Sequence, residues 1–207
     1  MEYLPNNDSD KHKQAYLCKL LWDMSRTDYF KYFDLFAGEG TYHLDNGEIF
    51  EGAAMLALDM ILELNFSYQA YLNEKDPERR KTLEKSVEIF KHNTEVNDEY
   101  QKHICRYIQL ADKNSLFFID PTHLTDYKEE DILEHLPDML ATEATLFLYA
   151  PESVNINEAH VHGKIINEIF NMIKESDRQH HDYKAGINDS RGYLKRIDHN
   201  IVVYPKI

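Results

Sequence analysis

The sequence predicts an α/β fold: a doubly wound, mostly parallel seven-stranded sheet with helices on both faces. Three observations support this class. Segments with helical periodicity alternate along the chain with short apolar segments, as in parallel strands joined by helices. The segment 116–119 is apolar throughout, which is typical of a strand covered on both faces. The strand expected at 29–36 runs into Gly38 and Gly40, and open parallel sheets bind ligands beyond such strand ends.

Each element of the first half has a local signal. Apolar residues at helical spacing indicate the first helix, and an Ala-, Leu- and Met-rich composition indicates the second. Pro77 is favoured at the first position of a helix. The elements expected here are a helix at 11–24, a strand at 29–36, a helix at 52–64, a strand at 68–73, a helix from Pro77 and a short strand at 94–97.

The second half continues the alternation and then closes the sheet. The elements expected are a helix over 99–114, a strand at 116–119, a helix at 128–140 that is interrupted or ends near Pro137, a strand at 145–149 that stops at Pro151, and a long helix at 157–176. A polar stretch rich in His and Asp follows this helix. Two further strands, 192–197 and 201–204, are expected as a hairpin with its turn at 198–200.

Composition indicates one folded domain over 1–207. A chain of 207 residues with 43% apolar and 12% aromatic residues can bury a core of its own. Cys18 and Cys105 are too few for a disulfide framework and indicate a reducing compartment. The first residues lack the basic-then-apolar order of a signal peptide, and no apolar run approaches the ~20 residues of a membrane span. We expect a cytoplasmic protein with no membrane association.

Charge is distributed unevenly along this domain. The net charge is −14, and residues 1–150 carry 15 Lys and Arg against 29 Asp and Glu, whereas residues 151–207 carry 8 of each. Residues 1–27 are expected as a helical lead-in and residues 178–207 as the closing hairpin with a basic, tyrosine-containing surface. That surface has two possible roles: it contacts an anionic or macromolecular acceptor, or it only balances the negative charge of the rest of the domain. Duplex DNA is not an expected partner, because each phosphate contact needs a cation.

Three strand ends carry residues suited to a nucleoside ligand. Asp34 precedes a Gly38-x-Gly40 turn, which allows a ligand to approach the backbone closely. The three-glycine dinucleotide fingerprint is absent, which disfavours a nicotinamide cofactor. Glu74 follows the second strand, where a carboxylate can accept both ribose hydroxyls, although alone it would be interpreted as a solvated acid. Asp98, after the third strand, suits an adenine amino group or a helix cap equally well.

The central apolar strand ends in Asp120-Pro121-Thr122-His123. A carboxylate that leaves a hydrophobic strand for a cleft can accept a hydrogen bond from a substrate amine or hydroxyl. His123 is then available as a base or as a stacking ring. The alternative is a strand-end aspartate in an ordinary turn, for which Asp-Pro is common. The sequence contains no metal-binding motif and no P-loop, so no metal ligand is expected.

The segments 34–40 (DLFAGEG), 73–76 (NEKD) and 117–121 (FFIDP) together resemble class I S-adenosylmethionine-dependent methyltransferases. The stretch 31–59 is similar in particular to the three-Cys-motif partner group. The 23S ribosomal RNA adenine methyltransferase group has a comparable Ala-Gly-x-Gly-x-Tyr segment. The resemblance covers residues 10–150, and it is specific for the cofactor and loose for the substrate.

This resemblance implies a Rossmann-like methyltransferase fold with S-adenosyl-L-methionine as cofactor. The loop on the methionine side would be formed by Asp34, Phe36, Ala37, Gly38 and Gly40. Glu74 would hold the ribose, Asp98 the adenine, and Asp120 would face the transferred methyl group. Enzymes that methylate adenine amino groups typically have Asp/Asn-Pro-Pro-aromatic at the catalytic motif, whereas this chain has Thr122 and His123 in the last two positions. Stacking of a flipped adenine is therefore not supported.

The function expected is methyl transfer from S-adenosylmethionine to an amine or similar acceptor. Asp120 would align the accepting lone pair and His123 would take the proton, while the cofactor carries the reactivity. The acceptors rank as a protein side chain, then a small amine, then an exposed single-stranded RNA base. Two alternatives stay open: an enzyme that degrades the cofactor without a methyl acceptor, and a non-catalytic cofactor-binding scaffold for a partner protein. The sequence does not indicate an oligomeric state.

Overall fold

The first half of the chain forms three α-helices and five strands. The computed structural model describes residues 8–24, 29–43, 47–64, 67–121, 125–153, 156–188 and 194–205. The elements of the first half are α1 (Asp8–Asp23), β1 (Tyr29–Asp34), β2 (Thr41–His43), β3 (Ile49–Glu51), α2 (Ala53–Glu63), β4 (Ser67–Asn73), α3 (Pro77–Ser86), the 3-10 turn η1 (Glu88–Phe90) and β5 (Thr94–Asn97). The β2-β3 ribbon has no counterpart among the expected elements.

The second half adds four strands of the main sheet and the helices of its other face. Its elements are the 3-10 turn η2 (Tyr100–Lys102), α4 (Ile104–Leu110), β6 (Ser115–Ile119), α5 (Asp126–Glu129), α6 (Ile132–Ala141), β7 (Thr145–Ser153), α7 (Ile156–Glu175), β8 (His180–Asn188) and β9 (Leu194–Val203). No helix of the described residues is long and apolar enough to cross a bilayer.

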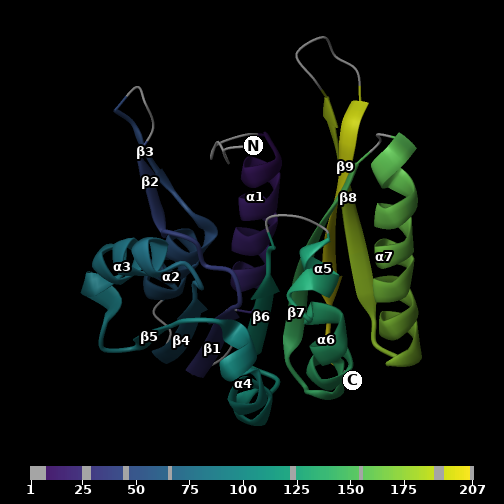
Figure 1. Cartoon of the computed structure of the whole chain (residues 1–207). Coiled ribbons are helices and arrows are strands. Elements are labelled where there is room, and N and C mark those ends of the chain that lie inside the picture. The colour runs from purple at the N-terminus through teal and green to yellow at the C-terminus, as the bar shows by residue number, and fades with distance from the viewer. Residues whose placement is uncertain are drawn as a thin grey trace.

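The main sheet has seven strands in the order β5-β4-β1-β6-β7-β9-β8 (Figure 1). Neighbouring strands from β5 to β7 run parallel, whereas β9 is antiparallel to both β7 and β8. The predicted doubly wound, mostly parallel seven-stranded sheet is therefore confirmed. Because β5, β4, β1, β6 and β7 run in one direction, their carboxyl ends meet at one edge of the sheet. The β2-β3 ribbon rises beyond that edge, beside α1 (Figure 1).

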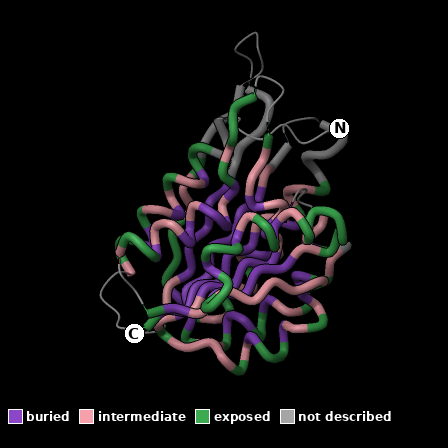
Figure 2. Tube along the Cα trace, turned by 90° about the vertical axis from the view of Figure 1, so that its left-hand side faces the viewer, coloured by how far each residue is buried: buried purple, intermediate pink, exposed green. Residues whose placement is uncertain are grey.

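Helices cover both faces of the sheet, with alternate strand residues in each core. Phe33 of β1 packs into the core that α4, α5, α6 and α7 complete, whereas Tyr32 packs into the core under α1, α2 and α3. Phe117 and Phe118 of β6 divide in the same way, and every residue of β6 is buried. The buried residues accordingly form a continuous layer along the sheet (Figure 2). The apolar segment 116–119 is thus the central strand that it was predicted to be.

The closing hairpin expected within 192–204 is wrong. β9 is one strand that continues through 198–200, where it pairs with β7 on one side and with β8 on the other. β8 occupies the polar His- and Asp-rich stretch for which no strand was expected. β8 is an edge strand, and an edge strand tolerates charged and polar residues because it is exposed along one side. Its polar composition therefore gave no strand signal in the sequence.

Two prolines differ from their expected roles. Pro137 lies inside α6, at an exposed position, and the break in the expected helix falls instead at Asp131, whose φ of 57° separates α5 from α6. Pro151 does not end β7, which pairs with β6 only as far as Leu148 and continues to Ser153. The missing N–H of Pro151 therefore costs no bond to β6.

Candidate functional site

The candidate site lies where β1 and β6 end side by side. From β1 the chain proceeds outward to β4 and β5, and it then returns to β6 on the other side of β1. The loops after β1 and β6 consequently leave the sheet in different directions, which is the position where doubly wound sheets bind ligands. Asp34 is in register with Phe118, and Leu35 N donates to Phe118 O at 3.1 Å. The chain segments that carry the glycine loop and Asp120 therefore leave the sheet next to each other.

The loop after β1 has a shape that requires glycine at two positions. Gly38 and Gly40 have φ values of 63° and 75°, in the left-handed region that other residues adopt rarely. A Cβ on Gly38 would lie 2.3 Å from the hydroxyl oxygen of Tyr42, and one on Gly40 would lie 2.9 Å from Leu83 Cδ1. Both close approaches exclude a side chain. The loop is thus built from backbone, as the Gly-x-Gly motif predicts.

Asp34 supports this loop from beneath. Its side chain is fully buried, Oδ1 accepts the Phe36 N–H at 3.0 Å, and Oδ2 accepts the Tyr32 hydroxyl at 3.0 Å. Burial raises the pKa of Asp34 to about 7, against an opposing effect of the Phe36 N–H. Asp34 has no exposed surface, and its bond from the Phe36 N–H holds the loop in place. We therefore assign Asp34 a role in supporting the loop.

We expect the protonation of Asp34 to make folding stability depend on pH. Its pKa rises from an ordinary value of 3.8 to about 7, so between these values the folded chain keeps a proton that the unfolded chain has lost. Stability should therefore fall as pH rises through this range, by up to about 1.4 kcal/mol per pH unit. Asp34→Asn should remove this component. Urea unfolding of both proteins at several pH values tests it, and identical pH profiles would contradict it.

A chain of buried hydrogen bonds, here called the polar relay, connects the ends of β1 and β4 with Tyr107 of α4. Asn73 Nδ2 donates to the Asp34 carbonyl at 2.7 Å, and the Tyr107 hydroxyl donates to Asn73 Oδ1 at 2.8 Å. Ala37 N donates to the Asn73 carbonyl at 2.9 Å. Sequence reasoning missed Asn73 and Tyr107 as site residues. The available signal was the polar side chain of Asn73 at the carboxyl end of its strand.

Glu74 leaves the end of β4 beside this relay. Its N–H donates to the Asn97 carbonyl at 3.1 Å, and its Oε1 accepts the Asp76 N–H at 2.8 Å. Burial raises the pKa of this half-buried carboxyl. Glu74 therefore lies at the carboxyl edge, one strand away from the glycine loop, and its contact with a ribose stays a prediction.

Asp98 lies farther out, after the edge strand β5. It binds Lys102 Nζ at 2.7 Å and His103 Nε2 at 3.0 Å, and these two groups lower the pKa of Asp98 to about 2. The carboxylate thus already holds two side chains of its own neighbourhood. An adenine amino group at this position would compete with them.

Asp120 forms an ion pair with a residue that sequence reasoning did not consider. Lys13 of α1 places Nζ 2.5 Å from Asp120 Oδ2, and the two side chains are 6% and 15% exposed. The same Nζ lies 4.8 Å from the centre of the ring of Tyr149, the residue of β7 that follows its last pair with β6. The lead-in helix α1 therefore belongs to the site. Thr122 and His123 lie outside the described residues, so the role of His123 stays a prediction.

A small chamber of about 30 Å³ connects these elements. Its lining residues come from α1, the glycine loop, the β2-β3 ribbon, the start of α2 and the end of β6: Lys13, Gln14, Phe36, Ala37, Tyr42, Phe50, Gly52, Ala53 and Asp120. Burial raises the pKa of Tyr42 to about 12, so its phenol is neutral at physiological pH. The chamber thus combines one ion pair with aromatic rings, and most of its exposed wall is polar.

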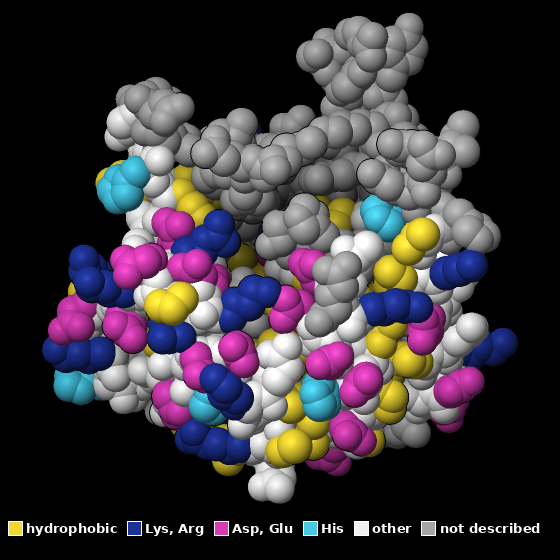
Figure 3. Space-filling view, in the orientation of Figure 1, with side chains coloured by type: hydrophobic (Ala, Val, Ile, Leu, Met, Phe, Trp, Pro, Cys, Tyr) yellow, Lys and Arg dark blue, Asp and Glu magenta, His cyan; other side chains and the backbone are white. Residues whose placement is uncertain are grey.

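The acids near the strand ends have cationic partners from other elements. Glu39 lies 3.7 Å from Arg79 Nε, and the partners of Asp98 and Asp120 are given above. Cationic side chains thus offset part of the negative charge at these strand ends. Basic and acidic side chains are also interspersed on the face shown in Figure 3. Among the described residues, no group of three His, Cys, Asp or Glu could hold a metal ion.

The expected basic surface at 178–207 is wrong for Arg178. This side chain is buried, and its guanidinium binds backbone carbonyls at the end of α6, in the turn before β7 and at the end of β9. Arg191 lies outside the described residues, and the side chains of Lys195 and Arg196 are likewise not described. The role of those three cations stays a prediction.

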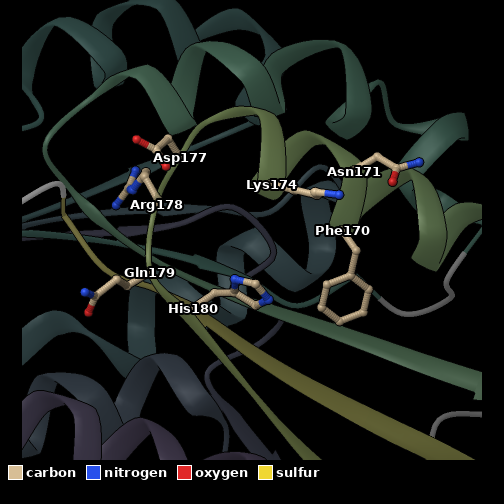
Figure 4. A pocket seen from close by; sticks show the side chains of 7 residues that line it. All are labelled: Phe170, Asn171, Lys174, Asp177, Arg178, Gln179 and His180. Carbon is tan, nitrogen blue, oxygen red and sulfur yellow. The ribbon is translucent and has the colours of Figure 1, made fainter.

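A larger hollow of about 470 Å³ lies at the opposite edge of the sheet (Figure 4). It is lined by Phe170, Asn171, Lys174, Asp177, Arg178, Gln179 and His180. His180 pairs with Val203, and Val203 with Leu146 near the start of β7, so the strand carboxyl ends lie at the far edge. Because Arg178 is already engaged by carbonyls, we place the functional site at the smaller chamber.

Comparison with known proteins supports the fold. No protein-family model and no curated protein matches the sequence. Among solved structures, a Legionella pneumophila protein of the DUF519 family has a TM-score of 0.73 at 14% identity, over 99% of this chain and 88% of that one. The chain has a Rossmann-like methyltransferase fold.

Two further structures with this fold are similar at lower scores. TYW2 of M. jannaschii, solved in complex with AdoMet, has a TM-score of 0.56 at 9% identity, over 98% of this chain and 79% of that one. A putative RNA methyltransferase of Pyrococcus horikoshii has a TM-score of 0.56 at 13% identity, over 98% and 86% of the two chains. At these identities the likeness concerns the fold alone.

Proposed function

We propose that this chain is an S-adenosylmethionine-dependent methyltransferase whose acceptor is an amine. The observation that carries the proposal is the carboxylate of Asp120, which lies beside the glycine loop and already binds a primary amine, the Lys13 Nζ, at 2.5 Å. Asp120 is thus able to bind the functional group that the reaction requires. A cytoplasmic location and membership of the three-Cys-motif partner group remain predictions from the sequence.

The residues present fit the cofactor. Gly38 and Gly40 have left-handed φ values, which give the backbone-only loop that the motif resemblance assigns to the methionine side. Phe36 and Ala37, which the motif resemblance assigns to the methionine side, line the chamber together with Asp120. Glu74 follows β4 at the same edge of the sheet, and we assign the ribose to it on the motif resemblance. The complex of M. jannaschii TYW2 with AdoMet shows that this fold accommodates the same cofactor in another chain.

The mechanism assigns orientation and desolvation to the protein. When bound, S-adenosylmethionine supplies an electrophilic methyl group on its sulfonium. Asp120 accepts a hydrogen bond from the acceptor amine and directs the nitrogen lone pair toward the glycine loop. Phe36, Tyr42 and Phe50 contribute aromatic rings to the wall of the chamber. Asp34 and Asn73 keep the loop in its shape through the bonds described above.

Glu74→Ala is expected to weaken cofactor binding without abolishing it. The wild-type affinity should be micromolar, about −8 kcal/mol. Loss of hydrogen bonds to a charged carboxylate should remove about 1.5–3 kcal/mol of it. Isothermal titration calorimetry measures the difference, with the exposed Glu84→Ala of α3 as the matched control. Equal affinities of wild type and Glu74→Ala would move the ribose site elsewhere.

The acceptor class is tested with labelled cofactor and cell lysate. After incubation with the purified protein, the label is separated into protein, RNA and small-molecule fractions. We expect the protein fraction to be labelled first, since Asp120 binds a lysine side chain. Label in RNA would instead favour the acceptor class suggested by the name of the P. horikoshii neighbour. Cofactor breakdown with no labelled fraction would favour the degrading enzyme, and binding without turnover would favour a scaffold.

A further inference from the structure

Lys13 occupies the position that an acceptor amine needs. Its Nζ is bound to Asp120 Oδ2 at 2.5 Å, and both groups line the chamber next to Phe36 and Ala37 of the glycine loop. Of the described lysines, Lys13 alone lines this chamber. The amine is brought there by α1, a helix that packs on α2 and reaches the sheet from residues far away in sequence.

The surroundings of Lys13 also suit a methylated ammonium group. Its Nζ lies over the ring of Tyr149 at 4.8 Å. Aromatic faces attract cations, and cages of aromatic rings are the usual recognition site of methyl-lysine. Tyr42 and Phe36 contribute rings to the chamber that Lys13 lines. A methyl group on this amine would therefore be close to the Tyr149 ring and to a chamber wall that is polar as well as aromatic.

We propose that Lys13 is a site of self-methylation, with S-adenosylmethionine as methyl donor. This inference rests on the proposed function. The Lys13 ammonium gives one proton to the Asp120 carboxylate, and its nitrogen lone pair forms a bond to the methyl carbon. The carbon–sulfur bond breaks, and its electron pair stays on sulfur as the uncharged thioether of S-adenosylhomocysteine. Lys13 becomes a secondary ammonium with two N–H groups, and Asp120 releases its proton to water.

The modified residue keeps a positive charge and two hydrogen-bond donors. It can therefore still pair with Asp120, but it carries a methyl group in a chamber of about 30 Å³. An external amine must displace Lys13 to reach Asp120. Self-methylation is thus expected to proceed in the absence of an external acceptor, and a small-amine acceptor in excess should slow it.

Peptide mass spectrometry tests the proposal. The chain is measured as purified from the expression host and again after incubation with methyl-labelled cofactor, and cleavage before aspartates releases residues 10–22. We expect one added methyl group, assigned to Lys13 by fragmentation. Lys13→Arg and Asp120→Asn should lose it. Lys19→Arg, an exposed lysine of the same helix paired with Asp23, should retain it.

A mixing experiment tests whether the transfer is within one chain, as the geometry requires. When wild-type protein is incubated with an excess of tagged Asp120→Asn chain, Lys13 of the tagged chain should stay unmodified. Methylation of the tagged chain, or of Lys19 in place of Lys13, would overturn the proposal. Cofactor binding by calorimetry and transfer to lysate acceptors separate the two claims. If both occur while Lys13 stays unmodified, self-methylation fails and the proposed function stands. If neither occurs, both fail.

Discussion

Asp120→Asn is expected to lower the rate of methyl transfer by about 10²–10⁴-fold, the range typical of a side chain that positions or deprotonates the reacting group. The affinity for the cofactor should stay the same, because the carboxylate serves the acceptor. An amide cannot accept the proton of the amine, and it orients the lone pair less strongly than a charged group. Turnover is measured with labelled cofactor, and affinity is measured by calorimetry on the same preparation.

Two controls protect this result from a change in folding. Asp120→Asn leaves the buried ammonium of Lys13 without its counter-charge, which can destabilise a protein by about 3–5 kcal/mol. The double variant Lys13→Gln/Asp120→Asn removes the charge as well and should be equally inactive. Asp138→Asn, at an exposed position of α6, should have wild-type activity. Full turnover by the folded double variant would remove Asp120 from the mechanism.

Arg178→Ala is expected to lower the free energy of unfolding by about 3–5 kcal/mol, because each buried acceptor left unpaired costs about 1–3 kcal/mol. Arg178 is 5% exposed, and its guanidinium donates to five backbone carbonyls, those of Leu140, Thr142, Ala144, Val203 and Tyr204. These carbonyls lie at the end of α6, in the turn between α6 and β7, and at the end of β9. Burial lowers the pKa of Arg178 to about 10, so the side chain is still charged at neutral pH.

Urea unfolding measures this loss. Arg178→Lys should recover part of the stability, since an ammonium has three donors whereas a guanidinium has five. Lys184→Ala, at an exposed position of β8, should change stability by no more than about 0.5 kcal/mol. If Arg178→Ala were as stable as wild type, the carbonyl bonds would have no structural role.

The sequence was sufficient for the parallel core of the fold, because periodicity and burial give local signals there. The strand at 94–97 and the apolar strand at 116–119 are both observed. β8 was missed because an edge strand lacks the apolar pattern of a buried one, and β9 was divided because Asp198, His199 and Asn200 have turn-like composition. The surroundings of these residues, and not their composition, decide their conformation.

The candidate site likewise contains residues that the sequence predicts and residues that it does not. Gly38, Gly40, Glu74 and Asp120 follow strand ends, so the motif order was enough to place them at one edge of the sheet. Lys13 could not be predicted, because its contact with Asp120 spans 107 positions and depends on how α1 packs on the sheet. Arg178 was interpreted as a surface cation for the same reason, since its burial depends on the end of α6, the turn before β7 and the end of β9, which meet only in the folded chain.

The most direct test of the central claim is a calorimetric titration of the purified protein with S-adenosylmethionine. The carboxyl-edge site predicts one binding site per chain with micromolar affinity, about −8 kcal/mol. S-adenosylhomocysteine should bind at the same site and displace it. Absence of heat with both compounds, confirmed by equilibrium dialysis with labelled cofactor, would contradict the assignment of the glycine loop and Glu74 to a methyl donor.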